Sequence, residues 1–598
     1  MNKYGVSTTR ASRTGFVGQR SILCRAIHAT IVGAGLSVPV VQAAQIQVNA
    51  FTDDGAGGLC TLREAIATIN SGAANGGCVK ASADAFGIND TIVFSASNTI
   101  TLTAGELAIS KNVSIDASSV SGVVISAADN SRIINLSADN LTLSHITLTG
   151  GSSSSAGGAV YAAAATTLTL SNSIVTNNQA DDEGGGIYLN SSAGTSSSLV
   201  LSNSTISYNN SNYSHGGGIA LVGNHAVAEL TTSLVSNNMA AEHGGGVYLG
   251  ANVADLSLTD STVSDNIASS MSGGGIHINS PDLGLNLFDS QVSGNVAGLD
   301  GGGVYLYSTT VDYSTANLQN VAFSNNTAGS NAAGAGFGGA LYMRYNRAQL
   351  VNSTVTANGA TQNGGGIAQI DSEMLLQDST LSGNTAEQDG GGLYSDNSNL
   401  SLERSTVSGN AGGSTAGHDG AGAWVSGGTL IMTNSTVSGN SAAGMGGGLY
   451  NYADAGTLTH VTFSGNQAVG SGGGIHDTSG VLNVVNSIVA NSLSGGDCSG
   501  GAMIDAASIV EDGGCSATRS GDPKLLPLQD NGGLSLTHAL RGNSPAIDTA
   551  DSAQCVTEDQ RSETRLATRC DVGAFEYLDQ SMFYVIPLKD GSVVVITI

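Results

Sequence analysis

Ionisable side chains recur along the chain directly before a glycine pair or, for Asp419, before its degenerate copy Gly420-Ala421. They are Glu183, His215, His243, Asp300, Asp389 and Asp419. If these positions stack in a repeating fold, equivalent side chains lie about 5 Å apart, which is the carboxylate separation of a retaining glycosidase. Asp389 and Asp419 would be such a pair, and their oxygens could also hold Ca²⁺. Turns favour Asp for backbone reasons too, so a structural role is the stronger prediction.

Basic side chains are rare in the same region. A polysaccharide lyase needs one to abstract the proton next to the sugar carboxylate, usually beside Ca²⁺. Between residues 157 and 495 the only Lys or Arg are Arg344, Arg347 and Arg404. Of these three, we expect only Arg344 to lie on the outward face that also carries the aromatic residues of the repeat. The weak catalytic candidates are therefore Arg344, Asp389 and Asp419. We predict no cofactor and no metal site, with Ca²⁺ as the open alternative.

Aromatic side chains occupy the fourth position after the first glycine in most copies of this motif. They are Tyr161, Tyr188, Tyr248, Tyr305, Tyr342, Tyr394, Trp424 and Tyr450, with His277, His476, Ala220 and Ala368 in the other copies. The preceding aliphatic residue, such as Val247, is expected to point inward and the aromatic therefore outward. This column could bind glycans by stacking on sugar rings. Its members could instead stack on each other and stabilise the fold, which we weigh more heavily.

Two motifs alternate along the chain and carry these positions. A Gly-Gly pair followed by a small residue and an aliphatic begins at eleven places from Gly157 to Gly472, and the degenerate copy Gly420-Ala421-Gly422-Ala423-Trp424 fills the one gap in the series. An apolar residue followed three positions later by asparagine lies between successive copies. The asparagines are Asn178, Asn209, Asn238, Asn266, Asn295, Asn326, Asn358, Asn384, Asn410, Asn440, Asn466 and Asn491. A period of 26 to about 30 residues is typical of a solenoid.

Strand patterning dominates within each repeat. Short apolar and Ser/Thr segments alternate, as in residues 256–259, and Gly and Asn mark turns that need positive φ. We therefore predict an all-β fold, a right-handed parallel β-helix of about twelve or more coils over residues 90–495. The asparagines should form an internal amide ladder.

The Gly-Gly element and Phe-x-x-Asn elements such as Phe323-Ser324-Asn325-Asn326 resemble the repeats of chlamydial polymorphic outer-membrane proteins. The resemblance covers roughly residues 150–495 and implies a β-helix without implying an activity. The chain departs from that family after Asn491, where too few residues follow for a C-terminal translocator. We therefore expect that it does not transport itself.

Composition and charge indicate an exported, folded protein. Its 598 residues include 84 glycines, and the formal net charge is −27 at pH 7. Such a surface repels nucleic acid and anionic lipid. Residues 1–43 have the features of a secretory signal: five Lys/Arg, an apolar core at 29–41, and Val41-Gln42-Ala43 at the cleavage site. No other stretch is long and apolar enough to predict a transmembrane helix.

Six cysteines follow the predicted signal and form three pairs that are local in sequence. The pairs are Cys60/Cys78, Cys498/Cys515 and Cys555/Cys570. Fifteen connectivities exist for six cysteines, of which the local one is the simplest. Each bridge would stabilise the fold by roughly 3 kcal/mol. Disulfides fit an oxidising compartment outside the cytoplasm.

The N-terminal end needs a cap, because an open β-helix exposes strand edges. Thr61 and Glu64 form a capping box that predicts a short amphipathic helix. The motifs Phe51-Thr52-Asp53-Asp54-Gly55 and Cys60-Thr61-Leu62-Arg63-Glu64-Ala65 resemble the CSLREA domain, with Thr61 in place of Ser. The resemblance implies an exported bacterial β-helix protein with an N-terminal cap at 44–89 and no known chemistry. We expect Arg63 and Glu64 to pair on the helix surface.

The C-terminal end carries four further motifs. They are Asp530-Asn531-Gly532-Gly533, Ser544-Pro545-Ala546-Ile547-Asp548, Asp559-Gln560-Arg561 and Asp571-Val572-Gly573-Ala574-Phe575-Glu576. Their succession resembles the choice-of-anchor Q domain and predicts a cap at residues 496–578. In residues 579–598 two apolar segments flank Asp590-Gly591, which predicts a hairpin that is either a last cap strand or a sorting tail.

Three functions are compatible with these sequence features. The first is a non-enzymatic adhesin or glycan-binding rod, extracellular or on the outer surface of a Gram-negative-type bacterium, with extracellular glycans or a host or matrix surface as partner. The second is a polysaccharide lyase or glycoside hydrolase of the pectate-lyase-like β-helix class, acting near Tyr342 and Tyr394. A groove closed by insertions at 327–337 and 411–419 would favour the enzyme. The third hypothesis is a module that binds glycans without degrading them.

Overall fold

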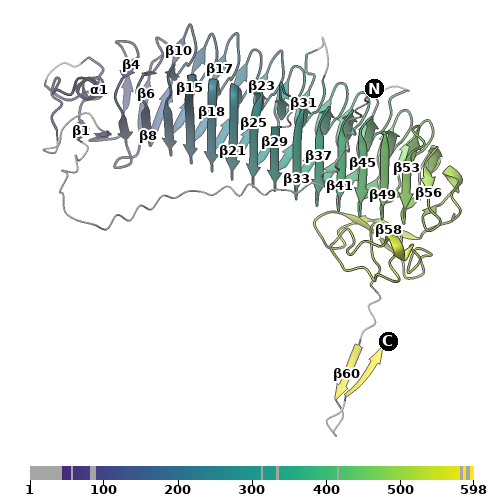
Figure 1. Cartoon of the computed structure of the whole chain (residues 1–598). Coiled ribbons are helices and arrows are strands. Elements are labelled where there is room, and N and C mark those ends of the chain that lie inside the picture. Colours follow the sequence, from purple (N-terminus) through teal and green to yellow (C-terminus); the bar gives the residue numbers. More distant parts are fainter. Residues whose placement is uncertain are drawn as a thin grey trace, which may run out of the picture. The chain divides into compact units, whose positions relative to one another are not determined.

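The computed structural model describes residues 44–54, 58–80, 89–310, 314–331, 336–413 and 417–578, and the backbone of 583–587 and 593–597. The predicted signal peptide lies outside the described residues. The chain forms a parallel β-solenoid of about 14 turns, which confirms the predicted fold class. Figure 1 shows the strands of successive coils lying side by side from β15 to β56. No helix among the described residues is long and apolar enough to span a membrane.

Most of the regular coils have four strands, and in three coils the first two are fused into one long strand, β15 (Ile187–Ser202), β18 (Ile219–Thr231) or β21 (Val247–Thr259). One coil contains β32 (Leu341–Arg344), β33 (Asn346–Val351), β34 (Thr354–Thr356) and β35 (Gly359–Ala360). They pair in parallel with β36 (Ile367–Ile370), β37 (Glu373–Gln377), β38 (Thr380–Ser382) and β39 (Thr385–Ala386) of the next coil. First and second strands lie in a 29-stranded sheet, third strands in a 16-stranded sheet and fourth strands in a 12-stranded sheet.

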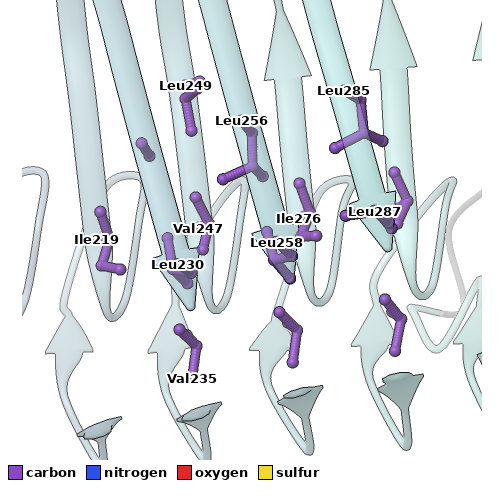
Figure 2. Packing of buried hydrophobic residues seen from close by; sticks show 14 of the residues in the cluster. Ile219, Leu230, Val235, Val247, Leu249, Leu256, Leu258, Ile276, Leu285 and Leu287 are labelled. Carbon is purple, nitrogen blue, oxygen red and sulfur yellow. The ribbon is translucent and has the colours of Figure 1, made fainter. Parts of the chain in front are cut away.

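Aliphatic side chains fill the interior of the coils. β18 (Ile219–Thr231), β21 (Val247–Thr259) and β24 (Ile276–Asn279) are paired so that Ile219, Val247 and Ile276 stack in one row, and all three are fully buried. Figure 2 shows this row together with a second one that contains Leu230 and Leu258. Since strand alternation buries every second residue, each coil adds the same apolar positions to one continuous core.

The predicted asparagine ladder is present within the solenoid. Nδ2 of Asn295 donates a hydrogen bond to Oδ1 of Asn326 at 2.9 Å, and the backbone N–H of Asn295 donates to the same oxygen at 3.1 Å. Asn491 was predicted as the last member, which is wrong. Because Phe463 pairs with Val489, the position equivalent to Asn466 falls one residue after Asn491, and Asn491 lies exposed at the surface.

A second ladder consists of serines that the sequence analysis did not single out. The backbone N–H of Ser379 donates to Oγ of Ser405 at 3.1 Å, and that Oγ donates to the carbonyl of Leu376 at 3.2 Å. The sequence signal that could have predicted this ladder is an Asn-Ser or Asp-Ser pair that recurs before the third strand. Each serine satisfies backbone groups at a corner where the strand hydrogen bonds are interrupted.

The N-terminal end has the predicted capping helix. α1 (Leu62–Ser71) begins with the capping box of Thr61 and Glu64 and ends at Gly72 in the left-handed conformation. β1 (Gln45–Val48) already pairs in parallel with β2 (Asp90–Phe94), so the solenoid starts inside the region predicted as a separate cap. Arg63 does not pair with Glu64 as expected. It binds Asp53 with two hydrogen bonds of 2.8 and 2.9 Å, because Glu64 is engaged in the capping box.

The C-terminal end differs from a simple end cap. β55 (Cys498–Gly500), β56 (Met503–Ile504) and β57 (Ile509–Val510) continue the coil past residue 495. The following segment folds back onto the outer face of the 16-stranded sheet. Oγ1 of Thr406 donates to the carbonyl of Leu536 at 2.7 Å, and Oγ1 of Thr462 accepts from the N–H of Ala574 at 2.9 Å.

All three predicted disulfides are formed, Cys60–Cys78, Cys498–Cys515 and Cys555–Cys570. The two apolar segments of the tail, β60 (Phe583–Pro587) and β61 (Val593–Thr597), pair in antiparallel fashion as a hairpin. Covalent links therefore lie in the segments that flank the repeats. They sit where the regular coil hydrogen bonds start and stop.

Candidate functional site

The aromatic column lies on the outer side of the first strands. Tyr342, Ala368 and Tyr394 form a small apolar cluster that is distinct from the interior core, and Tyr305, Phe337 and Trp424 pack against it. A similar cluster contains Tyr188 and Ala220. The column thus points outward from the coils as predicted.

The rings of the column stack on each other. Ring centroids are 4.9 Å apart between Tyr305 and Tyr342 and 4.5 Å apart between Tyr394 and Trp424, with interplanar angles of 6° in both pairs. Tyr342 and Tyr394 are only 7 % and 9 % exposed. Their faces are therefore occupied by protein, and the geometry favours a role in stabilising the coils over stacking on sugars.

Gaps in the column are filled by side chains from the turns. Ala368 leaves space between Tyr342 and Tyr394, and Phe337 contacts both rings edge-on, with centroids 6.4 and 5.9 Å away. Ala220 leaves a similar gap, where the ring of His215 stacks on Tyr248 at 4.5 Å. Within the part of the 327–337 insertion that the structure describes, Phe337 therefore covers the column.

The histidines beside the column are held in their neutral form. Burial lowers the pKa of His243 to about 4, with the neighbouring His215 as a further cause, and burial also lowers the pKa of His277. Nδ1 of His243 accepts a hydrogen bond from the N–H of Ser272 at 3.2 Å. Nδ1 of His215 accepts one from the N–H of His243 at 3.4 Å. The rings of His215 and His243 therefore accept backbone hydrogen bonds at the turns.

Asp389 and Asp419 also accept backbone hydrogen bonds at the turns. Oδ1 of Asp389 accepts from the N–H of Asp419 at 2.7 Å, and Oδ1 of Asp419 accepts from the N–H of Met445 at 2.7 Å. Asp300 bonds the N–H of Phe337 in the same way at 3.0 Å. Burial raises the pKa of Asp389, although the hydrogen bond from Asp419 opposes this effect. Each carboxylate thus caps the backbone of the next coil.

Arg344 belongs to a separate cluster. Its Nη2 lies 3.3 Å from Oδ2 of Asp371 and donates to the hydroxyl of Tyr345 at 3.1 Å, and its guanidinium lies 4.9 Å from the centre of the Tyr345 ring. Among the described residues no ion pair or hydrogen bond joins Arg344 to Asp389 or Asp419. The structure does not bring the three catalytic candidates together.

The C-terminal segment builds a buried polar network against the solenoid. Nη1 of Arg565 contacts Oε2 of Glu576 at 3.0 Å, and Nη2 of Arg565 donates to Oδ1 of Asn434 at 3.0 Å. Nε2 of Gln560 donates to Oγ1 of Thr406 at 3.0 Å. Burial raises the pKa of Asp571, in the same network, to about 6. Since these charges contact solenoid side chains, they attach the C-terminal segment to the coils.

One group of potential metal ligands occurs among the described residues. Ligand atoms of His460, Cys555 and Cys570 lie within 4.8 Å of one another. The two cysteines are joined in a disulfide, so neither offers a thiolate. This group therefore serves the covalent structure of the C-terminal segment.

Several hollows open on the outside of the described coils, and two of them are lined by residues that were not candidates from the sequence. One of about 320 Å³ lies over second strands between Arg347, Glu373 and Ile431. The other, of about 460 Å³, lies between Tyr208, Met239 and Ile267 at the corner of the 16- and 12-stranded sheets. A tyrosine at a turn position that holds Asn, Asp or Gly in neighbouring coils was the pattern that could have revealed the second hollow.

Residues 142–328 and 300–468 match a family described as the right handed beta helix region, and residues 460–478 match the Chlamydia polymorphic membrane protein repeat. The crystal structure of pectate lyase Pel9A aligns with a TM-score of 0.30 and 13 % identity, covering 69 % of this chain and 88 % of that chain. A similarity this low says nothing about activity. Among curated proteins none matches the sequence. Since the family match spans more than half of its length, the chain belongs to the right-handed β-helix family.

Proposed function

We propose that this chain is an exported β-helix protein that acts at the cell surface or in the extracellular space as a binding rod, either an adhesin or a glycan-binding protein, without catalytic turnover. The observation that carries the proposal is the engagement of Asp389 and Asp419. Each uses a carboxylate oxygen to cap the backbone of the following coil, and neither contacts Arg344.

Export is supported by three disulfides, which persist in oxidising compartments. It is also supported by the signal-like residues 1–43, by the acidic composition and by the match to the chlamydial membrane-protein repeat. We further propose that residues 44–89 form a CSLREA-like cap and that residues 496–578 form a choice-of-anchor Q-like domain. The tail at 579–598 would then be a hairpin available for sorting.

The polysaccharide-degrading alternative is tested by chain length. The mature chain, residues 44–598, is incubated with pectin and alginate in the presence and absence of Ca²⁺, and polymer size is measured by size-exclusion chromatography. We expect no shortening. Shortening that Asp389→Ala or Arg344→Ala abolishes, but that Asp129→Ala on an exposed turn leaves intact, would overturn the proposal.

Binding is measured in parallel on the same preparation. The mature chain is passed over immobilised neutral polysaccharides and over collagen and fibronectin, and retention is compared with that of its urea-unfolded form. We expect the folded chain to be retained on at least one surface. Failure to bind any of them, together with polymer shortening, would assign the protein to the enzymes.

A further inference from the structure

The turn between the third and fourth strands of each coil holds one residue with positive φ. Along the solenoid these residues are Gly150, Asn177, Tyr208, Asn237, Asp265, Gly294, Asn325, Ala357, Gly383, Gly409, Gly439 and Gly465. Gly, Asn and Asp tolerate this conformation, whereas a bulky side chain is strained there. Tyr208, with φ 55°, is thus the one large aromatic among these described turns. Strain at an exposed position points to a use for the side chain.

The Tyr208 ring is open to solvent, unlike the rings of the aromatic column. It is 59 % exposed, and no ring stack among the described residues includes it. It borders the hollow of about 460 Å³ that runs over four successive coils. The fourth strands β17 (Asn210–Ser211), β20 (Met239–Ala240) and β23 (Ile267–Ala268) form its floor, where Asn210, Met239 and Ile267 are aligned by the strand register.

Asparagine side chains lie next to the apolar residues Met239 and Ile267 in this hollow. Asn177 and Asn237 lie on the coils before and after Tyr208 and line the same hollow. Oδ1 of Asn210 is buried and has no hydrogen-bond partner in the described part of the chain, while its Nδ2 donates to Oδ1 of Asn212 at 2.5 Å. Because Oδ1 of Asn210 is covered, the amides that a ligand in the hollow can reach are the exposed ones of Asn177 and Asn237.

The charge of the hollow selects against anionic ligands. Asp265 is the charged residue in its lining, no Lys or Arg lines it, and the whole chain carries −27. Acidic polysaccharides and phosphate groups would be repelled. An exposed aromatic face, neighbouring amides and short apolar side chains form the kind of mixed surface that binds the two sides of a sugar ring.

We propose that this hollow is a binding site for a neutral, linear oligosaccharide that runs along the solenoid axis. Tyr208 supplies the stacking face, Asn177 and Asn237 bond hydroxyl groups, and Met239 with Ile267 covers the next sugar. Coils repeat about every 4.8 Å, close to the length of one pyranose residue, so successive coils meet successive sugars. The inference rests on the proposed function as a binding rod and names its ligand class and site.

The test uses the exported, processed chain and isothermal titration calorimetry with cellohexaose, xylohexaose, mannohexaose and chitohexaose. Tyr208→Asn introduces the residue type that both neighbouring coils carry at this turn, so it should fold at least as well as the wild type, which thermal melting verifies. We expect at least one hexasaccharide to bind and Tyr208→Asn to weaken it by at least about tenfold. Asn237→Gly, which keeps a residue that tolerates the positive φ of this turn, should weaken it as well.

Tyr452→Ala is the matched control, because Tyr452 is 58 % exposed and lies at the end of a first strand, β48 (Leu449–Tyr452). Binding should be unchanged in this variant. If Tyr208→Asn binds as tightly as the wild type, the site is wrong while the binding rod stands. If no hexasaccharide binds but a matrix protein does, the site is wrong and the adhesin remains. If neither binds, both proposals fail.

Discussion

The amide of Asn358 accepts two hydrogen bonds from Asn326, one from its side-chain Nδ2 and one from its backbone N–H, both at 2.9 Å. Nδ2 of Asn326 also donates to the carbonyl of Val292 in the interior at 2.9 Å. Both asparagines are buried. One side chain therefore satisfies backbone groups of two coils, and the arrangement repeats from Asn178 to Asn466.

Replacing Asn326 by Ala should lower the free energy of unfolding by about 3 kcal/mol. The change leaves the backbone N–H of Asn295 and the carbonyl of Val292 without the partner that Asn326 provides, and each orphaned group costs roughly 1–3 kcal/mol. Nδ2 of Asn295 loses one of its two hydrogen bonds and keeps the one to the carbonyl of Val263. Urea denaturation followed by circular dichroism measures the effect. Asn317→Ala is the control, because Asn317 is exposed. Equal losses in both variants would contradict a structural role of the ladder.

Truncating a ring of the aromatic column should also destabilise the coils. Tyr305 stacks between His277 at 4.6 Å and Tyr342 at 4.9 Å, so we expect Tyr305→Ala to cost about 2–3 kcal/mol. Tyr452→Ala, at an exposed ring, should change stability by less than about 0.5 kcal/mol. Thermal melting distinguishes the two. Unchanged melting of Tyr305→Ala would reopen the sugar-stacking interpretation of the column.

Arg565→Ala should detach the C-terminal segment from the solenoid. The variant leaves the buried carboxylate of Glu576 unpaired, and breaking a buried pair typically costs 3–5 kcal/mol. Hydrogen exchange should then increase in the covered strand β46 (Thr436–Ser438). Arg569→Ala removes an exposed pair with Asp548 and should cost at most about 1 kcal/mol. Protection of β46 that survives Arg565→Ala would show that other contacts hold the segment.

Stability should fall as the pH drops from about 6.5 towards 4. Burial, with Arg565 as a further cause, lowers the pKa of His460 to about 3 in the folded protein, against 6.5 for the free side chain. Below 6.5 the unfolded chain therefore takes up a proton that the folded chain does not, so the stability present above 6.5 is progressively lost. At pH 4.5 the loss is on the order of 2–3 kcal/mol.

Denaturation of wild type and His460→Gln at pH 7 and pH 4.5 tests this linkage. The substitution removes one titrating group, and the drop in unfolding free energy between the two pH values should become smaller. His225 is a suitable control, because it is partly exposed and bonds Ser196 and Asp255 near the surface. If His225→Gln flattens the pH dependence as much as His460→Gln does, burial of His460 is not the cause.

Local and periodic features could be predicted from the sequence. Thr61 and Glu64 are three residues apart, so their capping box needs no distant partner. The coil register follows from twelve repeats of the same motif, in which strand alternation decides which residues point inward. The outward direction of the aromatic column follows in the same way.

Contacts between distant residues could only be decided by the tertiary structure. Strand alternation says that Tyr342 points outward but not that Phe337 covers it. A shift of one residue in the last coil removes Asn491 from the ladder, and no motif shows that shift. The C-terminal motifs were visible, whereas the docking of Gln560 on Thr406 depends on how the chain folds back. The position of Tyr208 beside a hollow was likewise decided by the tertiary structure. The residues that line this hollow come from four coils and are far apart in the sequence.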